Sequence, residues 1–365
     1  MEPTSQFFSI NLSLLPLQRK LPIDLYINAS VKGKIKFVRV FPKDDQLTEN
    51  FREQLQKKYA QFYVPESQRQ DYFLLLGEYK KVEEVRLVKE MAVDHLQKVF
   101  ESANAQELTQ QLKHSPQVVQ QMGDALADKS IEELKIMIGQ LSFHDFYTFD
   151  HSINVCLYSL CFYRMIYPKA SKEKLMTMGV GALLHDIGKL KVATGIINKP
   201  GSLSDEEFAS IQKHPEEGVQ MISPLIKQLD QKINWQEVLK VISQHHENID
   251  GTGYPAKIQG EDIHHMAKVC AFADIFDALT TKRSYNEVVS FEKALEILAS
   301  LQNKKLDKKM FESIMRGMGK GLAQVHKKFE IDHKFDPSVP YRKLEIKEKA
   351  SRTIKETAHK VIKTH

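Results

Sequence analysis

The sequence lacks the features that mark a membrane, secreted or disulfide-bonded protein. Its longest largely apolar run, Val155 to Tyr163, is nine residues long and includes Ser159, whereas a membrane helix requires roughly 20 apolar residues. The chain does not open with a basic segment followed by an apolar stretch, so we expect no secretory signal. The three cysteines form no Cys-x-x-Cys pair, which excludes a disulfide framework and a zinc ribbon. These absences predict a cytoplasmic protein with reduced thiols.

Most of the chain also lacks an excess of either positive or negative charge. The 52 basic and 47 acidic residues leave a net charge of +5, which is too small to indicate binding to a nucleic-acid polymer. The segment from Tyr341 to His365 holds eight basic and three acidic residues, so it carries the whole excess. A hydrophobic share of 42% and a charged share of 27% are ordinary for a folded protein and exclude a disordered chain.

The length of 365 residues predicts two or three domains. Residues 1–80 are expected to form a small α+β module. Leu25–Ile27 and Ile35–Val40 are rich in strand formers and flank a turn-forming Lys-Gly-Lys, as in a hairpin. Residues 48–80 are expected to add helices and one more strand. This module has no catalytic constellation, so we expect it to sense, dock or dimerise.

The rest of the chain is predicted to be mainly helical. Residues 81–130 are expected to form a helical connector, residues 131–335 a helical bundle, and residues 336–365 a basic helical tail. Ser204 and Glu207 have the spacing of a capping box, which predicts a helix starting at Asp205. Ser171 can cap a helix that runs into Leu183. The fold class is therefore mainly α with a small N-terminal α+β module.

Histidines concentrate in one third of the chain, with eight of the fourteen between His144 and His265. His185 and Asp186 are adjacent and follow the apolar end of a predicted helix. A helix end lets both side chains reach one point. Because the residues before this pair are apolar, the Asp186 carboxylate is expected to be buried. Burial of a carboxylate costs free energy unless a cation compensates its charge.

A second helix end repeats this arrangement. An amphipathic helix that begins near Trp235 leads into His245 and His246, and Asp274 and Asp277 stand at helical spacing further on. These imidazoles and carboxylates suit iron, manganese or zinc, and the absence of thiolates argues against a structural zinc site.

Six motifs make the sequence similar to the HD-GYP family, the metal-dependent phosphodiesterases of the HD superfamily that degrade the bacterial second messenger cyclic di-GMP. They are His151-Ser-Ile-Asn-Val, His185-Asp-Ile-Gly-Lys, His214-Pro-Glu-Glu-Gly, His245-His-Glu, Asp250-Gly-Thr-Gly-Tyr-Pro and Asp274-Ile-Phe-Asp-Ala-Leu-Thr. The resemblance extends from residue 144 to residue 289 and implies a helical catalytic domain over residues 131–335.

The resemblance also implies a site for two divalent metal ions, usually iron, with manganese as the alternative. The ligands it implies are His151, His185, Asp186 and Asp274 for one ion, and Asp186, His214, His245 and His246 for the other. Asp186 would then bridge both ions. Some family members bind a third ion through a Glu at the position of Tyr147, so we expect no third ion here.

Further positions are assigned by the same resemblance. Lys189 and Arg283 match residues that contact substrate phosphates, and Asp186 and Lys189 are the expected catalytic residues. Apart from the resemblance, Tyr254 is a candidate contact for substrate or for a partner protein, with the shaping of a tight Gly-Tyr-Pro turn as its alternative role. Two acidic residues, Asp277 and Glu247, are expected to hold the ligands in place without contacting the metal ions themselves.

The activity implied is hydrolysis of cyclic di-GMP to linear pGpG, and onward to GMP, by a metal-bridged hydroxide. The alternatives are a catalytically weak receptor that binds cyclic di-GMP and signals through the N-terminal module, and an HD phosphohydrolase acting on another nucleotide. Intact ligand positions favour the enzyme, whereas Asn286, where the family usually has a basic residue, favours the receptor. Besides cyclic di-GMP, the candidate partners are a signalling protein or a second copy, bound through the N-terminal module or the tail.

Three histidines are not expected to be ligands. His264 and His265 match no family ligand and are predicted to be exposed residues at a helix start. His144 precedes the first motif and is likewise predicted to have no role in the site.

Overall fold

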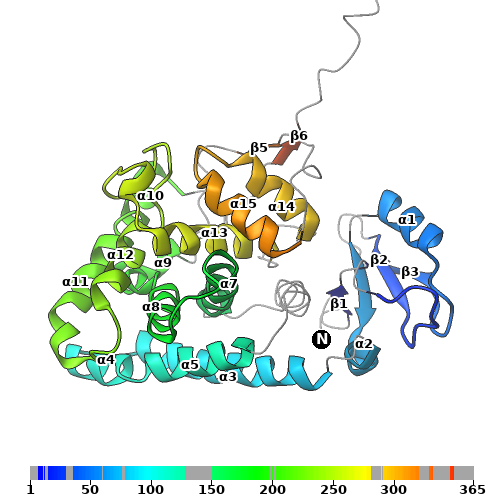
Figure 1. Cartoon of the computed structure of the whole chain (residues 1–365), viewed down its shortest axis with the longest axis horizontal. Helices are drawn as coiled ribbons and strands as arrows, with labels where there is room; N and C mark the ends of the chain where they lie inside the picture. The colour runs from blue at the N-terminus through cyan, green and yellow to red at the C-terminus, as the bar shows by residue number, and fades with distance from the viewer. Residues whose placement is uncertain are drawn as a thin grey trace, which may run out of the picture.

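A computed structural model describes residues 7–10, 12, 15–29, 36–59, 61–75, 79–127, 150–197, 199, 203–280, 289, 291–319, 329–331 and 346–348. These residues form a mainly helical protein with a small N-terminal sheet (Figure 1), which confirms the predicted fold class. Among the described helices, none is both long and apolar enough to cross a membrane.

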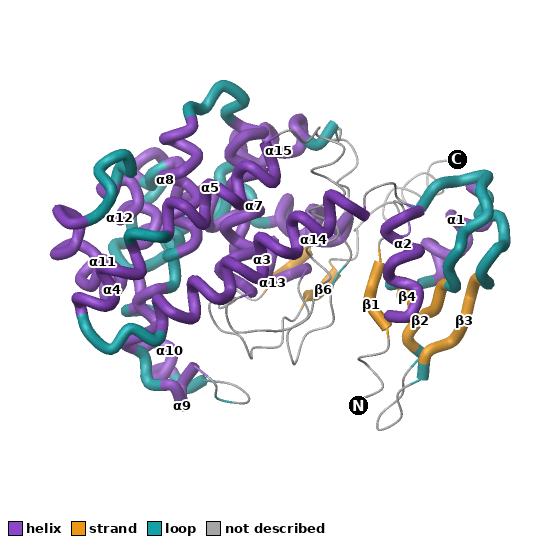
Figure 2. Tube along the Cα trace, turned by 90° about the horizontal axis from the view of Figure 1, so that it is seen from below, coloured by secondary structure: helices purple, strands orange, loops and turns teal. Residues whose placement is uncertain are grey.

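The N-terminal module is built on a four-stranded antiparallel sheet with strand order β1-β4-β2-β3. Figure 2 shows these strands side by side, in orange. Its elements are β1 (Phe7–Ile10), β2 (Leu25–Asn28), β3 (Phe37–Phe41), α1 (Glu49–Lys58), β4 (Phe62–Pro65), the 3-10 turn η3 (Glu66–Gln68) and α2 (Arg69–Leu75). The predicted pairing of the two early strands is confirmed, while the Lys-Gly-Lys turn lies outside the described residues.

The remaining elements are almost all helical. They are α3 (Tyr79–Phe100), α4 (Ala105–Leu112), α5 (Ser115–Ala127), α7 (Asp150–Ile166), α8 (Lys172–Leu183), η4 (Ile187–Lys191), α9 (Thr194–Ile197), α10 (Asp205–Ile211), α11 (His214–Ile222), η5 (Ser223–Gln228), α12 (Trp235–Gln244), η6 (Gly260–Asp262), α13 (His265–Thr280), α14 (Phe291–Ser300) and α15 (Lys308–Gly317). A short antiparallel ribbon joins β5 (Phe329–Ile331) to β6 (Ile346–Glu348). β6 is extended within the stretch predicted as a helical tail, and the rest of that tail lies outside the described residues.

Local sequence signals set the starts of two helices near the site. The Ser204 hydroxyl accepts a hydrogen bond from the Glu207 N–H, and the Glu207 carboxylate accepts one from the Ser204 N–H, which completes the predicted capping box of α10. Ser171 caps α8 by accepting from the Lys174 N–H. Both predicted helix starts are therefore confirmed.

Aromatic rings lock α7 against α13 in the centre of the bundle. The Tyr158 and Phe276 ring centroids lie 4.9 Å apart, and those of Phe162 and Phe272 lie 5.0 Å apart, both pairs edge to face. These contacts run in opposite order along the two helices, so α7 and α13 pack antiparallel. This packing fixes which polar side chains of α7 and α13 lie opposite one another.

The segment predicted as a connector is part of the bundle. Buried apolar side chains of α3, α4 and α5, among them Leu96, Leu112 and Met122, belong to the same hydrophobic core as those of α7, α8 and α13. Figure 1 shows α3 and α5 running along one side of α7 and α8. The N-terminal module has a separate core of its own.

A buried histidine ties two of these helices together. His95 on α3 is 6% exposed, and its Nε2 lies 3.0 Å from the hydroxyl of Ser115, the first residue of α5. Burial lowers the pKa of His95 from 6.5 to about 4. The ring is therefore neutral in the folded protein at pH 7.

This lowered pKa predicts a loss of stability in mild acid. Between about pH 6.5 and pH 4 the unfolded chain binds a proton at His95 that the folded chain does not, so the stabilisation is complete above pH 6.5 and is lost as the pH falls. The free energy of unfolding of metal-free protein should fall between pH 7 and pH 5 by about 1–2 kcal/mol more in the wild type than in His95→Gln. Urea denaturation followed by circular dichroism measures it.

The exposed Gln110, on α4, provides the control. Gln110→Ala should show the same pH dependence as the wild type. An equal dependence in His95→Gln and the wild type would contradict the assignment of a neutral buried ring at position 95.

Candidate metal centre

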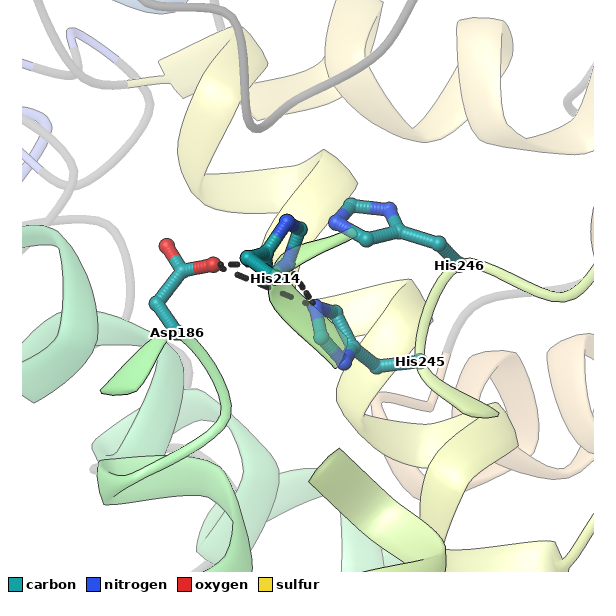
Figure 3. Close-up of side chains that lie close together, drawn as sticks. All are labelled: Asp186, His214, His245 and His246. Atoms are coloured by element: carbon teal, nitrogen blue, oxygen red, sulfur yellow. Dashed lines mark hydrogen bonds and ion pairs between the residues drawn. The ribbon is translucent and has the colours of Figure 1, made fainter. Parts of the chain in front are cut away.

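Seven histidines and aspartates gather in two groups. Within each group, ligand atoms lie within 4.8 Å of one another: one group is Asp186, His214, His245 and His246, and the other is His151, His185 and Asp274. Figure 3 shows the side chains of the first group pointing toward one another. We call them the Asp186 cluster and the His151 cluster. The structure thus brings together all seven residues that the resemblance implies as ligands, and these are the only two such groups among the described residues.

Helix ends deliver most of these side chains. His185 and Asp186 follow the last residue of α8, His245 and His246 follow the last residue of α12, and His214 is the first residue of α11. The predicted positions of the two adjacent pairs at helix ends are therefore confirmed. Adjacent side chains can reach one centre here because the chain leaves the helical path directly after Leu183 and Gln244.

A glycine lets the α8 end approach α11. A Cβ atom on Gly188 would lie 1.9 Å from the carbonyl oxygen of His214 and 2.6 Å from the amide nitrogen of Gly218. Any side chain at this position would therefore push η4 away from α11. Because the two backbones touch, Asp186 Oδ1 lies 3.2 Å from His214 Nε2.

Three of the histidines are oriented by the same backbone device. Each donates its Nδ1–H to the carbonyl oxygen three residues earlier: His185 to Ala182 at 2.7 Å, His214 to Ile211 at 2.7 Å, and His245 to Ile242 at 2.9 Å. A carbonyl can only accept, so the proton sits on Nδ1 and the lone pair on Nε2. Burial lowers the pKa of His214 and of His245 to about 4, so both rings are neutral at pH 7.

These lone pairs converge on a carboxylate. His214 Nε2 lies 3.2 Å from His245 Nε2 and 3.2 Å from Asp186 Oδ1, and His245 Nε2 lies 3.9 Å from the same oxygen. All three atoms are buried acceptors, so they cannot satisfy one another. His185 Nε2 likewise has no hydrogen-bond partner among the described atoms. A cation placed among such nitrogen and oxygen donors would satisfy them together, which fits a divalent metal ion.

Asp186 is shared by the two clusters. Its Oδ1 faces His214, whereas its Oδ2 lies 3.4 Å from His185 Nε2 and 3.9 Å from His151 Nε2. Lys189 Nζ is 2.6 Å from Oδ2. Burial alone would raise the pKa of Asp186, but the Lys189 charge and the surrounding histidines outweigh it and hold the pKa well below its usual value.

His151 is held by two carboxylates. Its Nδ1–H donates to Asp277 Oδ2 at 2.7 Å, and its Nε2 lies 3.1 Å from Asp274 Oδ1. Burial would lower the pKa of His151, but the two carboxylates raise it to about 9. Asp277 thus lies behind the ring, on the side away from Asp274.

Asn154 helps to hold Asp277 in place, a role that was not predicted from the sequence. Its Nδ2 donates to Asp277 Oδ1 at 2.8 Å, and its side chain is fully buried. It stands three residues after His151 on α7, so both side chains share a helix face. That spacing was the available signal, but its partner on α13 is distant in sequence.

Glu247 supports a loop through the backbone. Its Oε1 accepts hydrogen bonds from the N–H groups of Ala256 at 2.7 Å and Lys257 at 3.0 Å. Burial raises the pKa of Glu247. The contacts of this residue therefore fix the chain that follows the Gly-Tyr-Pro motif.

The remaining predicted residues divide into three outcomes. Tyr254 stacks on the His246 ring, with centroids 4.7 Å apart. The prediction that His264 and His265 are exposed is wrong, because both are partly buried. His265 Nε2 lies 3.2 Å from the Tyr163 hydroxyl at the end of α7, and His264 Nε2 lies 3.8 Å from Glu237 Oε1 on α12. Neither belongs to a cluster. Four predicted positions lie outside the described residues: His144, Tyr147, Arg283 and Asn286.

The contact between Asp277 and His151 generates a prediction. In Asp277→Asn the ring loses its negative partner, so its pKa should fall from about 9 and its orientation should loosen. Affinity for the ion assigned to the His151 cluster should fall roughly 10–100-fold. Mn²⁺ titration of metal-free protein measures this, with the exposed Asp262→Asn as control. Unchanged affinity in Asp277→Asn would show that His151 needs no anchoring carboxylate.

Comparison with known proteins identifies a domain that includes every member of the two clusters except His151. Residues 163–310 match the family model described as the HD domain. The cyclic di-GMP phosphodiesterase PA4108 of Pseudomonas aeruginosa is 34% identical over 180 residues, which are 49% of this chain and 41% of that protein. The 3′3′-cGAMP-specific phosphodiesterase 3 of Vibrio cholerae is 32% identical over 172 residues, 47% of this chain and 35% of that protein.

A solved structure also aligns with the chain. Bd1817, described as an HDG"Y"P protein from Bdellovibrio bacteriovorus, aligns with a TM-score of 0.48 and 20% identity, covering 84% of this chain and 98% of that one. The chain spans less than half the length of the two curated relatives. The protein contains an HD domain whose homologues are named cyclic-dinucleotide phosphodiesterases, which confirms the predicted resemblance to the HD-GYP family.

Proposed function

We propose that this protein is a metal-dependent phosphodiesterase that hydrolyses cyclic di-GMP to linear pGpG, and onward to GMP. The observation that carries the proposal is the convergence of Asp186 Oδ1, His214 Nε2 and His245 Nε2, three buried acceptors that one divalent cation would satisfy together. The similarity to a cyclic di-GMP phosphodiesterase supports the choice of substrate.

Each ion has a defined set of protein donors in this proposal. The His151 cluster together with Asp186 would hold one ion, and the Asp186 cluster the other. Asp186 can serve both because its two oxygens face different clusters. Two divalent ions supply Lewis acidity, which activates water and offsets the charge of the phosphodiester. Iron is the proposed metal, with manganese as the alternative, and no third ion is proposed.

The protein's own groups prepare the site for an anionic substrate. The neutral imidazoles leave their Nε2 lone pairs available without a proton having to leave first. Lys189 Nζ, 2.6 Å from Asp186 Oδ2, places a positive charge beside both clusters, where it can bind a non-bridging phosphate oxygen and stabilise charge that develops there. Arg283 is proposed as a second phosphate contact.

A second substrate is favoured by a specific comparison. The 32% identity to a 3′3′-cGAMP-specific phosphodiesterase makes 3′3′-cGAMP the alternative. The two molecules share the cyclic diphosphodiester and differ in one base, so a centre that acts on phosphate does not by itself discriminate between them. Discrimination would have to come from residues that contact the base.

The proposal is tested by product analysis. Purified protein loaded with Fe²⁺ or Mn²⁺ should convert cyclic di-GMP to pGpG, detected by chromatography, and 3′3′-cGAMP and nucleoside triphosphates are run in parallel. Asp186→Ala should abolish turnover and lose most of the bound metal, since it removes the donor that both clusters share. His264→Ala, a histidine outside both clusters, should keep metal and activity.

Two outcomes would contradict the proposal. Tight binding of cyclic di-GMP by metal-loaded protein without any product would indicate a receptor. Turnover of nucleoside triphosphates alone would indicate a phosphohydrolase of another class.

A further inference from the structure

We propose that Tyr254 is a positioning residue for His246: its ring holds that imidazole in the orientation that the Asp186 cluster requires. The inference rests on the proposed two-metal function. It gives the tyrosine of the Gly-Tyr-Pro motif a role toward a metal ligand, in place of the substrate contact that the sequence suggested.

The first observation is the contact between the rings. The phenol of Tyr254 stacks on the imidazole of His246 with centroids 4.7 Å apart and planes inclined by 21°. The same phenol presents its edge to His214, with centroids 6.4 Å apart at 81°. A ring stacked on one face of an imidazole opposes its rotation and keeps water from that face. Tyr254 therefore contacts two members of the Asp186 cluster.

His246 has little freedom to turn without disturbing its neighbours. Its ring centroid lies 4.1 Å from that of His245 and 5.0 Å from that of His214. The stacked phenol restricts His246 further, because rotation of the imidazole would break the parallel ring contact.

The backbone around Tyr254 is hydrogen-bonded to the segment that carries His246 and packs closely against it. The Tyr254 N–H donates to the His246 carbonyl oxygen at 3.2 Å. A Cβ atom on Gly253 would lie 2.5 Å from that same oxygen and 2.3 Å from the amide nitrogen of Asn248. Only a glycine permits this approach, and it brings the following tyrosine directly over the imidazole.

A second set of hydrogen bonds holds the residues that follow Tyr254. The Glu247 carboxylate, one residue after His246, accepts hydrogen bonds from the N–H groups of Ala256 and Lys257. The loop is therefore tied to the ligand-bearing segment both before and after the tyrosine. These hydrogen bonds involve backbone groups and the Glu247 carboxylate. Replacing the Tyr254 side chain therefore removes the stacking ring and leaves the hydrogen bonds in place.

The consequence should be confined to one ion. Without the ring, His246 should sample other orientations and the Asp186 cluster should bind its ion roughly 10–100-fold more weakly, as is usual when support for a ligand is lost. The ring contacts of Tyr254 are with His246 and His214, which both belong to the Asp186 cluster, so the ion of the His151 cluster should bind normally. The phenol hydroxyl plays no part in stacking, so phenylalanine should substitute for tyrosine.

Mn²⁺ titration of metal-free full-length protein tests the inference, with wild type, Tyr254→Phe and Tyr254→Leu compared. The wild type should bind two ions, Tyr254→Phe should match it, and Tyr254→Leu should bind one ion normally and the other roughly 10–100-fold more weakly. The ion that still binds normally shows that the leucine variant is folded. Tyr167→Leu, which removes an exposed tyrosine outside the centre, should match the wild type.

Each other outcome overturns the inference in a recognisable way. Wild-type affinity for both ions in Tyr254→Leu would show that the ring does not position His246. Weakened metal binding in Tyr254→Phe would assign the effect to the hydroxyl. An unaltered metal titration together with a raised KM for cyclic di-GMP in Tyr254→Leu would make Tyr254 a substrate contact instead. Failure of the wild type to bind metal would instead refute the proposed function on which the inference rests.

Discussion

Buried acceptor atoms that face one another are the constraint on which this structure depends. Asp186 Oδ1, His214 Nε2 and His245 Nε2 lie 3.2 to 3.9 Å apart, and their residues are almost fully buried. In metal-free protein these atoms repel, and the loss of their hydration is not compensated. Metal binding should therefore stabilise the fold as well as equip it for chemistry.

The rest of the bundle holds these atoms at that distance. The aromatic contacts between α7 and α13 fix two helices that contribute to the His151 cluster. Gly188 allows the turn after α8 to touch α11, and the carbonyl oxygens at the ends of α8 and α12 turn the lone pairs inward. Helices α3 to α5 complete the same core, so the segment predicted as a connector belongs to the scaffold of the site.

Sequence reasoning succeeded where the deciding signal is local. The capping box at Ser204 and the polar pair after Leu183 depend on neighbouring residues alone, and the motifs named every member of both clusters. It failed where the deciding partner is distant in sequence. Helical periodicity shows that α3 has an apolar face but not which helix covers it. Likewise, the burial of His265 depends on the end of α7, and the role of Asn154 depends on α13.

The central claim is that two metal ions share Asp186. Electron paramagnetic resonance of Mn²⁺-loaded protein tests it most directly, because ions bridged by one carboxylate couple their electron spins whereas separate ions do not. We expect the spectrum of an exchange-coupled pair in the wild type, and the spectrum of isolated Mn²⁺ for any ion that Asp186→Ala still retains. Isolated Mn²⁺ in fully loaded wild-type protein would contradict it.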